Sequence, residues 1–101
     1  MKASQQHEND MALLFYSDAM RQLESENPVW KKFRTCTAQT CATTDYYILK
    51  SYDTIVAIVL KLTGTGCDVL RYNYEFTRTS AYHIAKFFQQ HYVLKRYTYR
   101  N

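Results

Sequence analysis

YYILKSYDTIVAIVLKL, the stretch formed by residues 46–62, predicts two β-strands and decides the fold. Residues 46–52 are mainly aromatic or branched, and residues 55–62 form an almost continuous aliphatic run, as is typical of strands. Asp53-Thr54 separates the two runs. Because side chains alternate along a strand, one face of the second run carries Val56, Ile58, Leu60 and Leu62. We therefore expect this second strand to lie in the middle of a sheet.

The segment that follows predicts a turn and a third strand. Gly64-Thr65-Gly66 marks the turn, because glycine adopts the positive φ angles that a hairpin needs. In residues 69–76 an apolar set alternates with a more polar set, and the apolar set is Leu70, Tyr72, Tyr74 and Phe76. This alternation predicts an antiparallel strand with one face on the core. Tyr72 and Tyr74 are accordingly assigned to the core.

The C-terminal quarter predicts a helix and is compatible with a last strand. Residues 77–80 supply hydroxyl groups that can cap a helix. An apolar stripe follows, formed by Ile84, Phe87, Phe88 and His91, and it should lie on the sheet. Residues 93–100 alternate again, with Tyr97 and Tyr99 on one side.

The N-terminal third predicts helical structure. Residues 1–9 are polar and expected to be disordered, and from Asp10 apolar residues recur at helical spacing as far as Glu26. Pro28 ends this helix and should begin a short second helical turn, in which Trp30 and Phe33 anchor the chain to the core. Residues 35–44 hold five threonines and no charge, so an edge strand and a loop both remain open for this segment.

Together these elements predict one α+β domain over residues 1–101. It has a helical part over 10–34 and a sheet-and-helix part over 46–99. The sheet is antiparallel with three to four strands, an N-terminal amphipathic helix accompanies it, and a second helix packs on one face. The composition agrees, since 47% of the residues are hydrophobic and only two are glycine and one proline, which excludes long disorder and repeat architectures.

Charge is distributed unevenly along the chain. Residues 1–30 carry two basic and five acidic side chains, whereas residues 31–101 carry eleven basic and four acidic ones. No signal-like apolar segment opens the sequence, and the longest apolar run, Ile55–Leu60, is far too short to span a bilayer. We therefore expect a cytoplasmic protein without membrane contact. Its three cysteines are expected to be free thiols in a reducing compartment.

No local motif supplies a catalytic constellation. The chain lacks a nucleophile elbow, a phosphate-binding loop and a zinc-protease motif. One set could be tried for catalysis, namely His83 or His91 with Cys67 and Asp68, but both histidines are better explained as packing or hydrogen-bonding residues. The cysteine and histidine spacings do not fit a zinc site. We expect no enzyme activity, no cofactor and no metal.

Tyrosine is unusually abundant, with ten residues in the chain, and a surplus beyond the needs of the core suggests a contact surface. Cations beside aromatic residues gather in the C-terminal third, and the predicted partner surface is Arg78, Tyr82, Lys95, Arg96, Tyr97, Tyr99 and Arg100. In the tail the same pattern also fits a solvated edge strand guarded by charge.

Two short motifs resemble a family of small uncharacterised domains from phages and mobile elements of Gram-positive bacteria. The first is Leu49-Lys50-Ser51-Tyr52-Asp53-Thr54-Ile55-Val56-Ala57, and the second begins at Thr77 and includes His83, Ile84 and Phe87. The family pattern has arginine where Tyr82 stands. The resemblance covers residues 46–92 and implies a mobile-element context, in which small single-domain proteins often inhibit host defence, as anti-CRISPR proteins do.

These observations lead to one functional hypothesis and one alternative. The first is a non-catalytic binding protein of phage or mobile-element origin that inhibits host defence by contacting a Cas effector or another nuclease in the host cytoplasm. The alternative is a small basic nucleic-acid-binding regulatory protein, whose cations would neutralise phosphates and whose rings would stack on bases.

Overall fold

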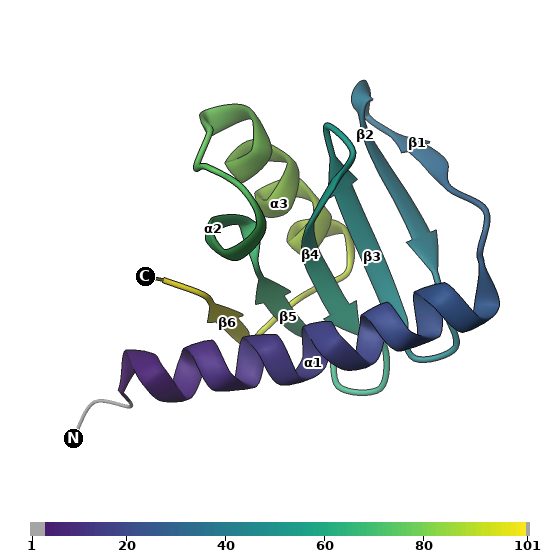
Figure 1. The fold of residues 1–101 in the computed structure, drawn as a ribbon. Coiled ribbons are helices and arrows are strands. Elements are labelled where there is room, and N and C mark those ends of the chain that lie inside the picture. The colour runs from purple at the N-terminus through teal and green to yellow at the C-terminus, as the bar shows by residue number, and fades with distance from the viewer. Residues whose placement is uncertain (1–3, 101) are drawn as a thin grey trace.

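The computed structural model describes residues 4–100, apart from the side chains of Thr35 and Cys36. One sheet lies between helices on both of its faces (Figure 1). The elements in chain order are α1 (Gln5–Glu26), β1 (Lys31–Phe33), β2 (Thr35–Ala42), β3 (Tyr46–Ser51), β4 (Thr54–Leu60), β5 (Thr65–Asp68), α2 (Leu70–Asn73), α3 (Arg78–Gln90) and β6 (Arg96–Thr98).

The six strands of the described residues follow one another across the sheet in the order β1-β2-β3-β4-β5-β6. Neighbouring strands are antiparallel except β5 and β6, which are parallel. The α+β class is confirmed, whereas the prediction of three to four antiparallel strands is wrong. Two short strands close the two edges of the sheet. β1 pairs with β2, which follows it directly in the chain, whereas β6 pairs with the distant β5.

The central strands are where the sequence places them. β3 and β4 pair along their whole length, and Val56, Ala57, Ile58 and Val59 of β4 are all buried. Ile58 packs on the α1 side and Val59 on the α3 side, which explains the continuous apolar run. The predicted face is wrong at two positions. A β-bulge beside Val56 moves this residue to the α3 side, and Leu62 lies beyond the strand in solvent.

The first helix begins earlier than expected. Ser4 is its N-cap and accepts a hydrogen bond from the His7 amide, so residues 5–9 are helical rather than disordered. Residues 1–3 lie outside the described part of the chain. The helix ends at Glu26 before a left-handed Asn27, as Pro28 predicts. Because α1 stops there, the helical part does not extend to residue 34.

The expected helical turn after Pro28 is absent, and β1 occupies its place. Phe33 is buried against Phe87, with ring centroids 6.1 Å apart, so its role as an anchor is confirmed. The Trp30 ring is half-buried and lies 4.2 Å from the Lys50 ammonium group. Of the threonine-rich residues 35–44, for which strand and loop are both compatible with the sequence, 35–42 form strand β2 and 43–44 lie in the turn that follows.

The predicted strand over residues 69–76 is wrong. Its first half is the short helix α2 and the rest is an irregular connection to α3. Asp68 accepts a hydrogen bond from the Leu70 amide at 3.1 Å, which turns the chain out of β5. Gly64 takes the positive φ of the turn before β5, whereas Gly66 lies in β5 under the Phe88 ring, where a Cβ would come within 2.9 Å of ring carbons.

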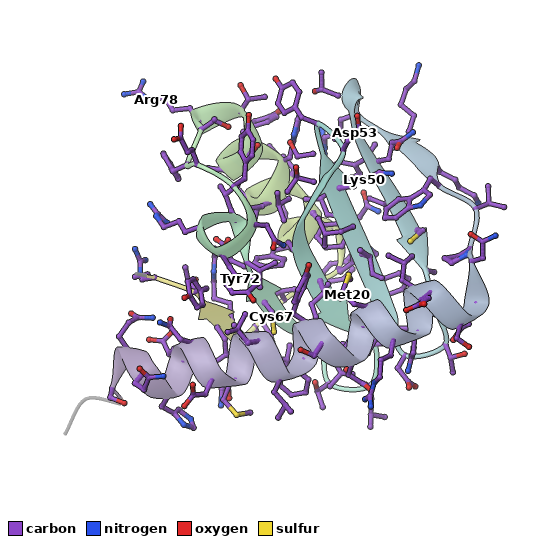
Figure 2. All side chains as sticks on the ribbon, viewed as in Figure 1. Met20, Lys50, Asp53, Cys67, Tyr72 and Arg78 are labelled. Carbon is purple, nitrogen blue, oxygen red and sulfur yellow. The ribbon has the colours of Figure 1, made fainter. Side chains whose placement is uncertain are left out.

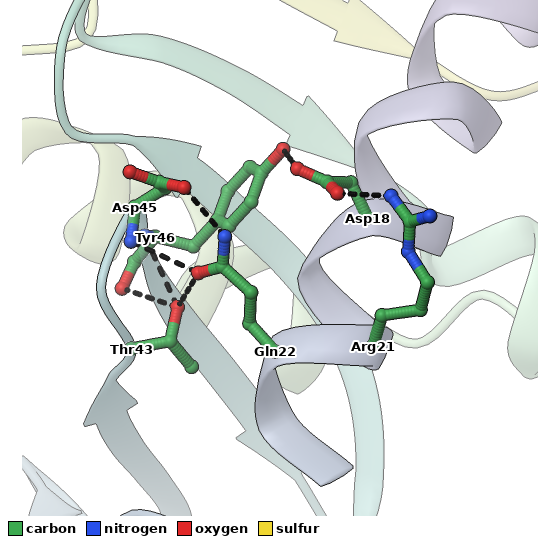
Figure 3. A network of polar contacts seen from close by, with 6 residues as sticks. All are labelled: Asp18, Arg21, Gln22, Thr43, Asp45 and Tyr46. Carbon is green, nitrogen blue, oxygen red and sulfur yellow. Dashed lines mark hydrogen bonds and ion pairs between the residues drawn. The ribbon is translucent and has the colours of Figure 1, made fainter. Parts of the chain in front are cut away.

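A polar network docks α1 on the turn between β2 and β3 (Figure 3). Asp18 accepts hydrogen bonds from the Tyr46 hydroxyl at 2.7 Å and from Arg21. The Tyr46 hydrogen bond, with help from Arg21, lowers the pKa of Asp18, whereas burial raises the pKa of Tyr46. Gln22 bonds to both Thr43 and Asp45.

Among the described residues, no helix is long and apolar enough to cross a bilayer.

Candidate interaction surface

The two short motifs of the sequence meet in space at the end of the molecule that carries the β3–β4 turn. The Ser51 hydroxyl lies 3.0 Å from the Ser80 hydroxyl and 3.1 Å from Nδ1 of His83. All three side chains are buried. Burial lowers the pKa of His83, so its ring is neutral at pH 7. The cluster therefore joins the β3–β4 turn to the first turns of α3, and the expectation that His83 is a packing and hydrogen-bonding residue is confirmed.

Exposed side chains lie above this buried cluster. Tyr52 forms the tip of the β3–β4 turn with Asp53, and about half of its surface is exposed. Tyr82 is exposed to a similar degree on α3, and Arg78 projects into solvent at the start of the same helix (Figure 2). Thr77 caps α3 by accepting a hydrogen bond from the Ser80 amide, as its hydroxyl predicts. The helix thus holds Arg78 and Tyr82 in fixed positions.

The connection between α2 and α3 adds more exposed rings. Tyr72, Tyr74 and Phe76 are each about half exposed, so the assignment of Tyr72 and Tyr74 to the core is wrong. Apolar and polar residues alternate here as they do in a strand, and this pattern leads to the wrong prediction. Asp68, which turns the chain before Leu70, is the one local feature that indicates the short helix α2. The Arg71 guanidinium lies 4.5 Å from the centre of the Phe76 ring.

We call the exposed rings of these adjoining segments, together with the exposed Arg78 and the half-buried Arg71, the aromatic surface. Its rings come from the β3–β4 turn, the α2–α3 connection and the outer side of α3, and its cations flank the rings. The residues are Tyr52, Tyr74, Phe76 and Tyr82 with Arg71 and Arg78. Sequence analysis identifies Arg78 and Tyr82 and misses the other four.

The tail residues predicted for the same surface lie elsewhere. β6 is an edge strand beside the first turns of α1 (Figure 1). The Tyr97 ring stacks on Phe15 of α1 at 6.4 Å, and Tyr99 packs against Tyr72 at 5.2 Å. Both tyrosines are half-buried. The structure therefore does not bring the tail tyrosines together with Arg78 and Tyr82.

The tail cations have partners within the chain. Arg96 forms an ion pair with Asp68 at 3.2 Å and lies 4.9 Å from the centre of the Phe88 ring. The Lys95 ammonium group lies 5.1 Å from the Tyr97 ring, and both backbone groups of Arg100 are bonded to Asn9. The side chains of Lys95, Arg96 and Arg100 are nevertheless exposed.

The residues considered for catalysis do not form a site. Cys67 packs in the core on the α1 side of the sheet, whereas His83 lies on the α3 side and His91 stacks on Tyr47 at 4.1 Å. Burial raises the pKa of Cys67 to about 12, which leaves it a thiol at pH 7. Within the described residues, no three His, Cys, Asp or Glu side chains gather where they could hold a metal ion.

Comparisons with protein-family models, with curated proteins and with solved structures found no significant match to this chain.

Proposed function

We propose that this chain is a non-catalytic binding protein that contacts another protein through the aromatic surface. Tyrosine and arginine are, with tryptophan, the residues enriched among those that contribute most to protein–protein affinity, and the rigid tyrosine ring needs little ordering to make a contact. Tyr52, Tyr74, Phe76 and Tyr82 are each about half exposed, Arg71 lies over the Phe76 ring, and Arg78 is exposed at the start of α3. Such a surface is suited to covering a patch on a partner.

The conformation of Tyr52 is the observation that carries this proposal. Tyr52 and Asp53 form the two-residue turn between β3 and β4 with φ angles of 50° and 69°. Turns of this kind favour Asn-Gly, because a bulky side chain is strained at positive φ. The Tyr52 ring is half exposed, so packing inside the chain returns little of that cost. A contact with a partner supplies a reason for tyrosine at this position.

The resemblance of residues 49–57 and 77–87 to phage and mobile-element domains narrows the class of partner. We propose a host-defence nuclease, with Cas effectors as the first candidates, whose activity in the host cytoplasm is blocked when this chain covers its surface. A partner with carboxylates beside an apolar patch would complement Arg71 and Arg78.

Binding to purified Cas effectors and inhibition of target cleavage test this proposal. Tyr82→Ala keeps α3 intact, because alanine is a good helix former, and it should weaken binding roughly tenfold or more if Tyr82 is a central contact. Tyr92→Ala is the matched control, since it removes an exposed tyrosine outside the aromatic surface. The proposal fails if no effector binds at micromolar concentration, or if both variants bind like the parent chain.

A second candidate is the nucleic-acid-binding function, favoured by the excess of cations over residues 31–101 and by the exposed Lys95, Arg96 and Arg100. It requires affinity for DNA or RNA that falls steeply with salt, and alanine at these three positions should flatten that dependence. Capture from the host with and without nuclease treatment separates the two functions. A partner retained after nuclease treatment supports protein contact, and a partner lost with the nucleic acid supports the alternative.

A further inference from the structure

Two adjoining loops at the opposite end of the sheet expose apolar side chains almost completely. The turn after β4 and the loop after α3 lie side by side, since the Gly66 amide donates to the Lys95 carbonyl at 2.9 Å. Leu62 on the first loop is 91% exposed, and Tyr92 and Leu94 on the second are 85% and 99% exposed. Three such side chains together expose an apolar area of a few hundred Å². The largest apolar patch on a monomer is commonly of this size and often serves as a contact surface.

The backbone conformation of Tyr92 gives no structural reason for tyrosine at this exposed position. The Val93 amide donates to the Phe88 carbonyl and the Tyr92 amide to the Gln89 carbonyl, which is the Schellman pattern at a helix end. Glycine usually occupies the left-handed position of this pattern, where Tyr92 has φ 54°. Tyr92 is strained and makes little contact within the chain. A contact outside the chain accounts for it.

The same end of the molecule carries a cavity that these side chains could enter. It measures about 460 Å³ and is lined by Leu14, Phe15, Ser17, Asp18, Arg21 and Tyr46, with Leu14 itself exposed. Tyr46 pairs with Leu60 at the end of β4, and the Lys61 amide donates to the Asp45 carbonyl at 2.9 Å. Cavity and loops therefore lie at one end, on either side of the strand ends.

We infer that this end binds a second copy of the chain around a twofold axis, with the loops of each copy seated in the cavity of the other. Because loops and cavity share one end, a single twofold axis forms both junctions. Charge favours this arrangement over a dimer in which the loops of the two copies contact each other. The two loops, residues 61–66 and 91–95, carry Lys61 and Lys95 and no carboxylate. Over its whole length α1 carries five carboxylates and one arginine, and of these Asp18 and Arg21 line the cavity.

This dimer is independent of the proposed function, because the aromatic surface lies at the other end of the sheet. Each copy would present its own Tyr52 and Tyr82 outward. Failure of the dimer leaves partner binding as it is, and failure of partner binding leaves the dimer.

Sedimentation analysis of the full chain tests the inference. The buried area is at the small end for protein interfaces, so we expect a reversible dimer that forms between about 5 and about 500 µM and weakens with salt. Leu94→Thr removes the loop contact and Leu14→Lys puts a cation beside the incoming Lys95. Each should weaken association roughly tenfold or more. Tyr82→Ala is the control for association, since Tyr82 is 51% exposed on α3 at the other end of the sheet.

Mixing the two variants separates the reciprocal arrangement from other dimers. A Leu94→Thr chain keeps its cavity and a Leu14→Lys chain keeps its loops, so the mixture should form a heterodimer with one intact junction and associate more tightly than either variant alone. A chain that stays monomeric over the whole range overturns the inference. A dimer that Leu94→Thr leaves unchanged also overturns it, as does a mixture that associates no better than its parts, because loops meeting loops or another surface would then be responsible.

Discussion

Tyr52 and Tyr92 both occupy left-handed backbone positions at which glycine or asparagine is less strained. Their side chains are exposed, so packing within the chain does not offset the backbone strain at either residue. Local sequence preference and native conformation disagree at these two residues, whereas they agree at Ser4 and Thr77, the helix caps. Disagreements of this kind concentrate at functional positions, and both tyrosines lie on surfaces proposed to bind.

Replacing Tyr92 by glycine should stabilise the isolated chain. Glycine relieves the strain at the helix end, and about 1 kcal/mol of unfolding free energy should be gained, which for a domain of this size raises Tm by about 5 °C. Thermal unfolding at low protein concentration measures the change. Tyr92→Ala, which removes the ring and keeps a Cβ at positive φ, should give no such gain. A loss of stability in Tyr92→Gly would mean that the ring has contacts within the fold.

At the scale of elements, the ends of α1 and β6 depend on each other. Gln5 donates to the Thr98 carbonyl at 2.9 Å, and Asn9 bonds to both the amide and the carbonyl of Arg100. Taken by themselves, the polar residues at positions 5–9 predict disorder, because the local sequence does not show their contacts with residues 98–100. They form helix because they satisfy backbone groups along the outer side of an edge strand, which would otherwise invite pairing with another chain.

Asn9→Ala should loosen the end of β6 without unfolding the domain. The Arg100 amide loses its acceptor, so its hydrogen exchange should accelerate, and the unfolding free energy should fall by about 1 kcal/mol. Gln6→Ala is the matched control, because the Gln6 side chain bonds only to Asp10 within α1 among the hydrogen bonds described. Equal exchange rates at Arg100 in both variants would contradict this coupling of helix and tail.

At the scale of the whole molecule, the sheet separates two cores. One packs under α3 and contains Leu49, Val59 and Phe87, and the other packs under α1 and contains Cys41, Ile58 and Cys67. Burial raises the pKa of Cys41 to about 11 and that of Cys67 to about 12, so neither thiol is a ready nucleophile in the folded chain. Because both thiols belong to the core under α1, we expect a reagent to reach them only when α1 leaves the sheet.

Thiol labelling should therefore report on unfolding of the whole domain. In a Cys36→Ser variant, used because only Cys41 and Cys67 then remain, a thiol reagent at pH 8 should react slowly. Both cysteines should react at one common rate that tracks global unfolding in denaturant. Rapid labelling of one cysteine in the absence of denaturant would contradict this, because it would show that α1 opens locally over that part of the sheet.

Much of the scaffold follows from the sequence alone. The aliphatic run of β4 identifies a central strand, since only a strand covered on both faces needs such a run, and the spacing of Ile84, Phe87 and Phe88 identifies the buried side of α3. Thr77 marks the start of that helix. Of the candidate surface, the sequence identifies Arg78 and Tyr82, a cation and an aromatic residue at the corner where the chain enters this helix.

The tertiary structure decided the rest. Alternation over residues 69–76 has the same period in a half-buried strand as in this short helix and loop, so only the turn at Asp68 reveals that Tyr72 and Tyr74 are exposed. β6 runs parallel to β5 because residues 96–98 pair with residues 66–68, a contact between distant segments that no local pattern encodes. Local periodicity identifies the residues that are apolar enough to be buried, whereas contacts between distant segments determine which of them are buried in the folded chain.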